Sequence, residues 1–385
     1  MRFIRRWCAT GAAVALVLGG TVPSAMAIEP TTYQIGVDNA APAGHDWLYM
    51  DFFPRSAVKV HQGDVLDLKW NTGSVDALHT ATLVPLGATP PELFVPDGDD
   101  DASQAQINPA AFAPTDPTCG SAGKPCPYDG SSLLSSGAQP TVPGFDFFVA
   151  VNVKAGRGPV TVTYECLVHP GMRGSVTVVP DSQAASTPQE VQAAAARQFR
   201  MDTVGARQAE AQAEQRAVTS NPDGTRTVTM TAGTATDFVE VAEMLPHTVQ
   251  IRPGDTVKWV TKTIKDVHTV TFPQGSGSNA VDPLQAVCEA SGSTDSSPPC
   301  SSPSAQELHY DPQPQGATAI TSPTTVGSSG ALSNPPAPFP NSFSFNFPNA
   351  GTFAYQCRIH DHMTGAVVVA TPRNLPSVAQ LPGQP

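Results

Sequence analysis

One pattern of seven residues, Cys-x-x-His-x-x-Met, occurs twice in the 385-residue chain. It reads CLVHPGM at 166–172 and CRIHDHM at 357–363, so the two copies are 191 residues apart. A thiolate, an imidazole and a thioether, completed by a second imidazole, form the soft ligand set that suits copper cycling between Cu(I) and Cu(II). The pattern therefore predicts two copper sites, each with two histidines, one cysteine and a weak axial methionine.

Each site needs one more histidine, and each half of the chain offers one at the same relative position. His79 lies 87 residues before Cys166, and His268 lies 89 residues before Cys357. Taken singly, these side chains could be inert thiols, core methionines or hydrogen-bonded surface histidines, but their duplicate spacing favours the ligand interpretation. The predicted metal ligands are His79, Cys166, His169 and Met172 in the first half, and His268, Cys357, His360 and Met363 in the second.

The chain is an internal duplication whose halves have the pattern of short strands. HQGD at 61–64 recurs as RPGD at 252–255, and LHTATL at 78–83 recurs as VHTVTF at 267–272, in the same order. Two copies are too few for a solenoid, so each copy is expected to be a self-contained domain. Apolar residues alternate with polar ones between Gly/Pro turns, which favours antiparallel sandwiches. The clearest strand patterns lie at 58–60, 65–70, 160–164, 342–347 and 353–355.

Helix is expected only at the junction between the halves. Residues 187–190, Thr-Pro-Gln-Glu, form a capping box with proline at the first helical position, and 190–217 is rich in Ala, Gln, Glu and Arg. A break near Gly205 is one alternative, and Asn-Pro-Asp-Gly at 221–224 is expected to end the helix. Its apolar face is thin, which predicts a linker that packs lightly or stands free.

Two long polar segments, 86–142 and 274–340, interrupt the strand patterns and are too long for hairpin loops. They are interpreted as surface insertions. The first contains the acidic run 97–101, which lacks the ligand spacing of an EF-hand and is interpreted as a solvated loop rather than a calcium site.

The N-terminus has the pattern of a signal peptide. Arg2, Arg5 and Arg6 precede an apolar run at 9–22 and the cleavage-site pattern Ala-Met-Ala at 25–27. The apolar run is too short for a membrane anchor, and no other segment is long and apolar enough to span one. The product is therefore expected to be exported to a periplasm, a cell wall or the medium, without stable membrane insertion.

Cysteine usage agrees with an oxidising compartment. Six cysteines lie beyond the predicted signal peptide, and two close pairs among them, Cys119/Cys126 and Cys288/Cys300, are predicted to form disulfides. One odd thiol then remains in each half, and it is the cysteine of the repeated pattern.

The charge balance excludes some partners and favours others. The chain has 21 basic and 33 acidic residues and a formal net charge of −12, which argues against nucleic-acid binding. Loss of the three arginines with the signal peptide makes the charge −15, which favours a cationic redox protein as donor or acceptor. The oligomeric state is left open.

The ligand loops resemble those of a known family. CLVHPGM, followed by Arg173 and Gly174 and a valine-rich strand, is similar to the amicyanin loop, and FNFPNAGTFAYQCRIHDHM at 345–363 resembles small bacterial plastocyanin-like domains. The chain thus resembles the cupredoxins, the type 1 blue copper proteins, over most of 31–180 and 222–371 outside the insertions. The resemblance implies a Greek-key β-sandwich with copper at one end, and it implies that the ring edges of His169 and His360 reach the surface.

The predicted fold is all-β, with two tandem Greek-key, cupredoxin-like sandwich domains joined by a helical linker. The predicted boundaries are a signal peptide at 1–27, the first domain at 28–182, the linker at 183–220, the second domain at 221–372 and a tail at 373–385.

Electron transfer by two type 1 copper ions is the favoured function. The enzymes of similar architecture, nitrite reductases and multicopper oxidases, carry a histidine directly after the ligand cysteine, where this chain has Leu167 and Arg358. An enzyme would also need an open coordination position, so catalysis is disfavoured. Copper sequestration outside the cytoplasm is the alternative.

Three further residues near the ligands carry expectations. Thr80 and Thr269 each follow the first ligand histidine, and their hydroxyls are expected to hydrogen-bond to the cysteine loop, although both could equally be ordinary strand residues. His362 is expected to be an exposed side chain rather than an extra ligand.

Overall fold

The structure is a computed structural model. It describes residues 29–71, 78–92, 94–96, 105–139, 144–169, 171–263, 265–275, 284–288, 306–310, 313–334, 339–360 and 362–371. The predicted signal peptide, the acidic run 97–101, Cys300, the side chain of Cys288 and the predicted tail 373–385 lie outside the described residues.

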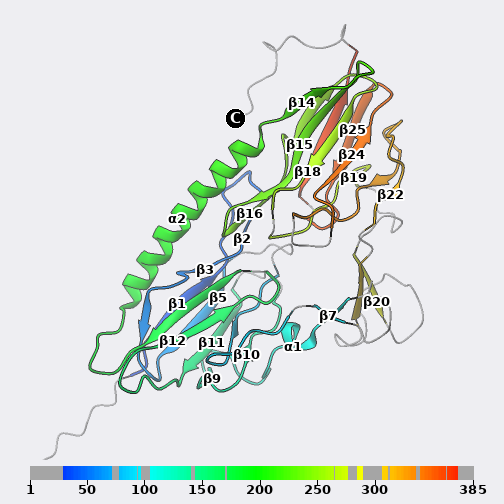
Figure 1. Ribbon diagram of the computed structural model, residues 1–385. Coiled ribbons are helices and arrows are strands. Elements are labelled where there is room, and N and C mark those ends of the chain that lie inside the picture. Colours follow the sequence, from blue (N-terminus) through cyan, green and yellow to red (C-terminus); the bar gives the residue numbers. More distant parts are fainter. Residues whose placement is uncertain are drawn as a thin grey trace, which may run out of the picture. The chain divides into compact units, whose positions relative to one another are not determined.

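The first half forms two five-stranded sheets, with the orders β3-β1-β5-β11-β9 and β10-β6-β12-β13-β4 (Figure 1). Aromatic rings from the two sheets pack against each other in the core. Phe52 of one sheet lies edge-on to Tyr164 of the other, with ring centroids 4.8 Å apart. Burial alternates along the strands, so that Phe147, Val149 and Val151 face the core. The strands are β1 (Thr32–Val37), β3 (Phe52–Phe53), β4 (Val58–Val60), β5 (Val65–Trp70), β6 (Thr82–Leu83), β9 (Cys126–Tyr128), β10 (Leu134–Ser135), β11 (Asp146–Val151), β12 (Val160–Glu165) and β13 (Arg173–Val178).

The second half repeats these pairings. β15 pairs parallel with β18 as β1 does with β5, β18 pairs antiparallel with β24 as β5 does with β11, and β17 pairs parallel with β26 as β4 does with β13. The two sheets have the orders β2-β16-β15-β18-β24, where β2 is Trp47–Tyr49, and β17-β26-β25-β19-β23-β22, with β14 paired to β15. The strands are β14 (Ala217–Ser220), β15 (Arg226–Ala235), β16 (Val239–Leu245), β17 (Thr248–Ile251), β18 (Thr256–Val260), β19 (Thr271–Phe272), β22 (Gln315–Gly316), β23 (Gly327–Ser328), β24 (Ser342–Asn346), β25 (Gly351–Gln356) and β26 (Thr364–Val369).

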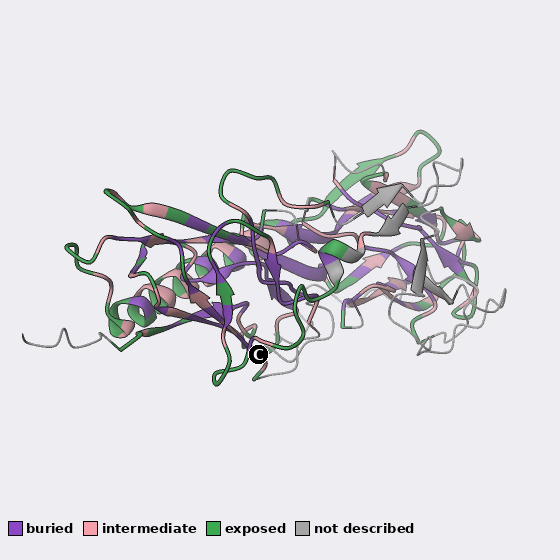
Figure 2. Ribbon diagram, turned by 90° about the horizontal axis from the view of Figure 1, so that it is seen from below, coloured by how far each residue is buried: buried purple, intermediate pink, exposed green. Residues whose placement is uncertain are grey.

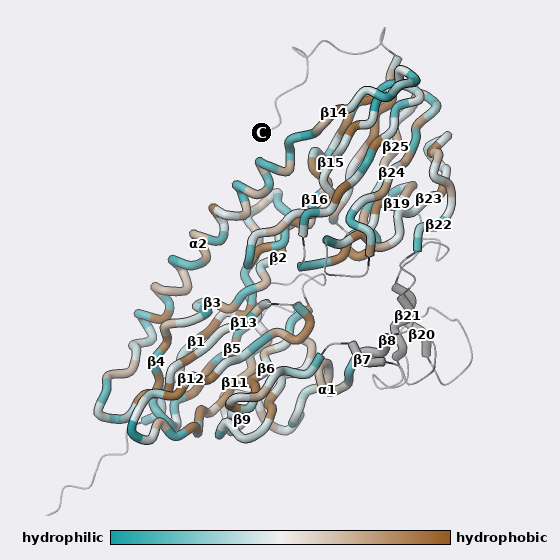
Figure 3. The backbone as a smooth tube through the Cα atoms, in the orientation of Figure 1, coloured by the Kyte–Doolittle hydropathy of each residue, from teal (hydrophilic) through white to brown (hydrophobic). Residues whose placement is uncertain are grey.

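These pairings confirm the predicted all-β fold of two sandwiches with a helix at their junction. Hydrophobic residues lie along the strands of both halves, and the buried residues follow the same strands (Figures 2 and 3). None of the helices in the described part of the chain has the length and apolar character that crossing a membrane requires.

One strand of the first half belongs to a sheet of the second. β2 (Trp47–Tyr49) pairs antiparallel with β16, and the amide of Met50 donates to the carbonyl of Phe238 next to this pairing. From Thr31 onward the chain forms one compact unit. The halves are therefore joined by backbone hydrogen bonds as well as by the helix.

The junction helix α2 (Pro188–Ala213) begins at the predicted capping box. The Thr187 amide donates to Glu190 Oε2 at 2.8 Å, and the Glu190 amide donates to Thr187 Oγ1 at 3.2 Å. The helix runs unbroken through Gly205 and ends before the predicted residue 217, and the turn at 221–224 instead connects β14 to β15.

The expectation that the helix packs lightly is wrong. Ala206 and Ala213 are fully buried, and Phe199 packs against Tyr49 and Phe53. The hydrophobicity of this face is low because much of it is alanine, but small side chains let a helix approach a sheet closely. A helix with a thin apolar face can therefore still pack closely against the sheets.

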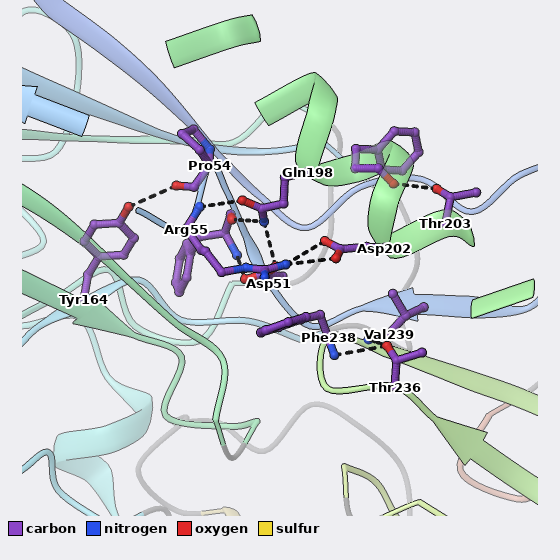
Figure 4. Close-up of polar contacts among 12 residues, drawn as sticks. Asp51, Pro54, Arg55, Tyr164, Gln198, Asp202, Thr203, Thr236, Phe238 and Val239 are labelled. Carbon is purple, nitrogen blue, oxygen red and sulfur yellow. Dashed lines mark hydrogen bonds and ion pairs between the residues drawn. The ribbon is translucent and has the colours of Figure 1, made fainter. Parts of the chain in front are cut away.

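Arg55 ties the helix to both halves (Figure 4). Its Nη2 donates to both carboxylate oxygens of Asp202 on α2 at 2.9 Å, and its Nε donates to Asp51 Oδ2 at 2.8 Å. The guanidinium carbon lies 3.3 Å from the ring centroid of Phe238, just before β16. Burial raises the pKa of Asp51 to about 7, although Arg55 opposes this shift.

The two predicted insertions are partly built into the sandwiches. β9 and β10 from the first segment, and β22 and β23 from the second, extend the sheets at their edges. Two further two-stranded sheets lie in these segments, β7 (Phe94–Pro96) with β8 (Ala105–Ile107) and β20 (Leu284–Cys288) with β21 (Gln306–Tyr310), as does the short helix α1 (Pro109–Phe112). The predicted disulfide between Cys119 and Cys126 is confirmed.

Candidate metal centres

Three predicted ligands of the first half converge at one buried point. Cys166 Sγ lies 3.8 Å from His79 Nδ1 and 3.6 Å from His169 Nδ1, and the two Nδ1 atoms are 3.0 Å apart. Nitrogen and sulfur ligands about 2.0–2.3 Å from a shared ion and about 120° apart lie about 3.5–3.7 Å from one another. Both sulfur–nitrogen distances are close to this range, and the nitrogen–nitrogen distance is shorter.

The second half repeats the cluster. The donor atoms of His268, Cys357 and His360 lie within 4.8 Å of one another, with Cys357 Sγ 3.7 Å from His360 Nδ1. His268 Nδ1 is buried without a hydrogen-bond partner, which is the condition of an imidazole nitrogen left for a metal. One thiolate and two imidazoles in each cluster fit a copper ion.

The same backbone bonds close both ligand loops. Cys166 follows β12, its amide donates to the carbonyl of Met172 at 2.9 Å, and the Met172 amide donates to the His169 carbonyl at 3.2 Å. In the second loop, after β25, the corresponding distances are 2.8 and 3.0 Å. Met172 and Met363 are both buried at the ends of these loops. The sequence pattern thus produces one loop conformation twice.

The strand that carries the first histidine is hydrogen-bonded to the cysteine loop. The Thr80 amide donates to Cys166 Sγ at 3.4 Å, and Thr80 Oγ1 accepts from the Leu167 amide at 2.8 Å. Thr269 makes the matching bonds, with Cys357 at 3.3 Å and with the Arg358 amide at 2.8 Å. The predicted hydroxyl contacts are confirmed.

Both cysteines are held in the form that binds metals. Burial alone would raise the pKa of each thiol, but the neighbouring histidines outweigh it and lower the pKa of Cys166 and of Cys357 well below the ordinary value. The thiolate is the species that coordinates a metal.

A carboxylate lies near the Nε2 atom of three of the four ligand histidines. These carboxylates were not predicted from the sequence. His268 Nε2 lies 3.0 Å from Glu240 Oε1, and His360 Nε2 lies 3.1 Å from Asp266 Oδ2. His79 Nε2 lies 3.9 Å from Asp38 Oδ2. The hydrogen bonds of Glu240 and Asp266 fix the orientation of their imidazoles and raise the basicity of the rings, whereas the Asp38 oxygen is too far from His79 Nε2 for a hydrogen bond.

One signal for Glu240 was present in the sequence. It lies in VEVAEML, whose seven residues are all buried in β16, and an acidic residue in such an apolar run needs a partner inside the protein. Nothing local marks Asp38 in the same way, because it faces His79 across 41 residues of chain.

Gly233 leaves the space that His268 occupies. A Cβ at this position would lie 2.1 Å from His268 Nε2, and the φ of +75° is one that glycine tolerates best. The register of β15 against β16 shifts between Ala232 and Thr234, so the glycine forms a bulge that turns the backbone around the imidazole.

The implied surface edges of the second histidines are not found. Only 6% of His169 and 3% of His360 is exposed. Asp266 accepts a hydrogen bond from His360. Burial lowers the pKa of His169, but Cys166 and, to a smaller extent, the charge of Asp266 raise it above the ordinary value. Lys265 Nζ would lie 3.2 Å from a Cβ on Gly171 in the first ligand loop. The segment 265–266 thus adjoins both ligand loops. His362 is exposed, as predicted.

Comparisons with known proteins find similarity among solved structures. No protein-family model matches the chain, and no curated protein matches it. An amicyanin from Paracoccus versutus is 17% identical with a TM-score of 0.19, covering 41% of this chain and 92% of its own. An auracyanin from Roseiflexus castenholzii is 17% identical with a TM-score of 0.21, covering 39% and 98%. A copper nitrite reductase from Nitrosomonas europaea is 10% identical with a TM-score of 0.19, covering 89% and 95%. Likenesses this low carry no argument about function, and the cupredoxin-like description rests on the strand pairings and the two clusters.

Proposed function

We propose that the chain is an exported electron carrier that binds one type 1 copper ion in each half. The observation that carries this proposal is the duplicated, buried set of one thiolate and two imidazoles, whose donor atoms lie within 4.8 Å of one another in both halves. Copper bound by such a set changes between Cu(I) and Cu(II) with little rearrangement. Met172 and Met363 are proposed as the weak fourth ligands.

The surrounding residues keep the donor atoms in place. Two backbone bonds close each ligand loop, and a threonine hydroxyl joins the loop to the strand of the first histidine. Carboxylates hold the far ring nitrogens of His268 and His360. A site whose ligands are already fixed needs little movement when its charge changes, which is what electron transfer requires.

A carrier is favoured over an enzyme because both clusters are closed. All six cysteine and histidine ligands are buried, and neither Leu167 nor Arg358 supplies the histidine that would connect a cysteine to a second copper centre. Catalysis at copper needs a position open to substrate. Copper sequestration uses the same ligands and is the second candidate.

The visible spectrum and the copper content of the full chain test the proposal. We expect two copper ions per chain and an intense thiolate-to-Cu(II) absorption band, half of which is lost in Cys166→Ser and the other half in Cys357→Ser. Rapid electron exchange with a redox protein would distinguish a carrier from a sequestration protein. A chain that binds copper without the band, or that binds a single ion, contradicts the two-site assignment.

A further inference from the structure

A third cluster of metal-binding side chains contains no cysteine. His45 lies just before β2, Glu210 lies on α2 and Glu243 lies on β16. His45 Nδ1 is 3.3 Å from Glu210 Oε2 and 3.7 Å from Glu243 Oε1. One donor atom from each of the three residues lies within 4.8 Å of the other two. His247, which follows β16, places its Nε2 3.3 Å from the second oxygen of Glu243.

The central carboxylate of this cluster is buried. The side chain of Glu243 is 1% exposed, and those of Glu210 and His45 are 18% and 26% exposed. In the described part of the chain, the ion pairs of Glu210 and Glu243 are all with histidines. A buried carboxylate is unfavourable unless it is paired with a charge or coordinates a metal, and a bound cation would meet this requirement.

Two atoms of the cluster lack a hydrogen bond. Glu243 Oε1 accepts from the Asp46 amide at 3.1 Å, but Glu243 Oε2 and His45 Nδ1 are buried atoms with no hydrogen bond of good geometry. Buried polar atoms without partners are rare in native proteins. His45 Nδ1 faces Glu210 Oε2 and Glu243 Oε1, so a cation among these three atoms would satisfy it, whereas Glu243 Oε2 is turned toward His247.

We propose that His45, Glu210 and Glu243 bind a divalent transition-metal ion, with Zn²⁺ as the matching metal. Imidazole and carboxylate are zinc ligands at about 2.0–2.2 Å, and tetrahedral ligands at that radius lie about 3.4 Å apart, close to the two distances found. His247 contacts the far oxygen of Glu243 and positions this carboxylate. The three ligands come from the segment before β2, from α2 and from β16, so the ion would hold α2 against the β2–β16 pair.

The test uses the full chain with its copper sites loaded, so that added zinc cannot enter the cysteine clusters. We expect calorimetric titration with Zn²⁺ to show one further site per chain, and we expect zinc to raise the melting temperature. The main variant is Glu243→Gln. It removes the negative charge of Glu243 but keeps an oxygen that can accept from the Asp46 amide. Glu210→Gln and His45→Asn provide milder changes if Glu243→Gln folds poorly. Each of the three variants should weaken zinc binding by about 10- to 100-fold or more. Loss of a residue that only supports a metal ligand already costs about this much, and these variants change the ligands themselves.

His61→Asn is the matched control, because His61 lies outside the cluster and bonds to the carbonyl of Gln183. Its zinc affinity should equal that of the wild type. With the copper sites held as Cu(I), which has no visible thiolate-to-Cu(II) band, Co²⁺ in place of Zn²⁺ should add visible d–d bands and no thiolate absorption. Wild-type protein that binds no third ion, variants that bind zinc normally, or Co²⁺ with thiolate absorption would each overturn the proposal. Copper content is measured separately, so failure here is distinct from failure of the electron-carrier proposal.

Discussion

Asp266 accepts a hydrogen bond from the Nε2 of His360 at 3.1 Å. Asp266 lies two residues before His268, the other histidine of the same site. One short segment therefore carries both a ligand and the carboxylate that holds His360. Burial lowers the pKa of His360, but Asp266 outweighs this effect and raises it well above the ordinary value. The potential of the second site should therefore depend on this carboxylate.

Asp266→Asn keeps the size of the side chain and removes its negative charge. A negative charge near copper stabilises Cu(II), so its loss should raise the reduction potential of the second site. A unit charge about 6 Å away is worth about 0.7–3 kcal/mol at an effective dielectric constant of 20–80, which corresponds to about 30–130 mV for one electron. Redox titration in a Cys166→Ser background reports this site alone. Asp223→Asn, in the exposed turn before β15, is the control, and an equal potential in both variants would contradict the prediction.

Gly233→Ala should damage the second site and spare the first. The new methyl group would lie 2.1 Å from His268 Nε2, so the ring must leave its position and Nδ1 must leave its place in the cluster. We expect the second copper ion to be lost or strongly weakened, measured by copper content and by half of the visible absorption. Gly224→Ala is the matched control, because Gly224 has a similar φ of +84° with nothing within 4 Å of its added Cβ. It should cost only the backbone strain, of order 1–3 kcal/mol.

Thr80→Val removes a hydroxyl that accepts from the Leu167 amide. A buried donor left without a partner costs about 1–3 kcal/mol, so the free energy of unfolding should fall by this amount and copper binding in the first half should weaken. Thr80→Ser retains the hydroxyl and should restore most of the loss. Denaturant unfolding of both variants measures the difference, and equal stabilities would show that the hydroxyl has no such role.

Much of this arrangement could be predicted from the sequence because its signals are local. The alternation in β5, β12 and β24, the capping box at Thr187 and the close pair Cys119 and Cys126 each involve residues a few positions apart. The ligand clusters join distant residues, but the duplication supplied a second copy against which spacings could be checked.

The missed features depend on contacts without a local pattern. β2 has three residues and no alternation, so its pairing with β16 could not be foreseen. Asp266 and Glu240 meet their histidines only after the sheets have formed, and Glu210 and Glu243 lie on a helix and a strand that no motif connects. The segment 265–266 adjoins the loops of His169 and His360, and no local pattern marks these contacts.

Stability should fall with rising pH through the titration of Asp51. Burial raises its pKa from 3.8 to about 7, so between these values the folded protein holds a proton that the unfolded chain releases. The folded state therefore loses stability as the pH rises through this window, by roughly 2–4 kcal/mol. Denaturant unfolding at pH 5 and pH 7.5 should show this loss in the wild type and a smaller one in Asp51→Asn. The exposed control Asp116→Asn should behave as the wild type, and equal pH slopes in all three proteins would contradict the assignment.

The last prediction concerns how electrons reach the buried sites. Because His169 and His360 are 6% and 3% exposed, a partner must dock over the loops around them, and the expected mature charge of −15 should steer a cationic partner toward the protein. Steering weakens as salt shortens the Debye length from about 30 Å at 0.01 M to about 10 Å at 0.1 M. Stopped-flow reduction by a cationic redox protein should therefore slow as salt is added, and reduction by an anionic one should accelerate. A small neutral reductant needs no steering and serves as the control. If neither protein partner responds to salt, the acidic residues lie away from the docking surface, and apolar contacts must guide the encounter.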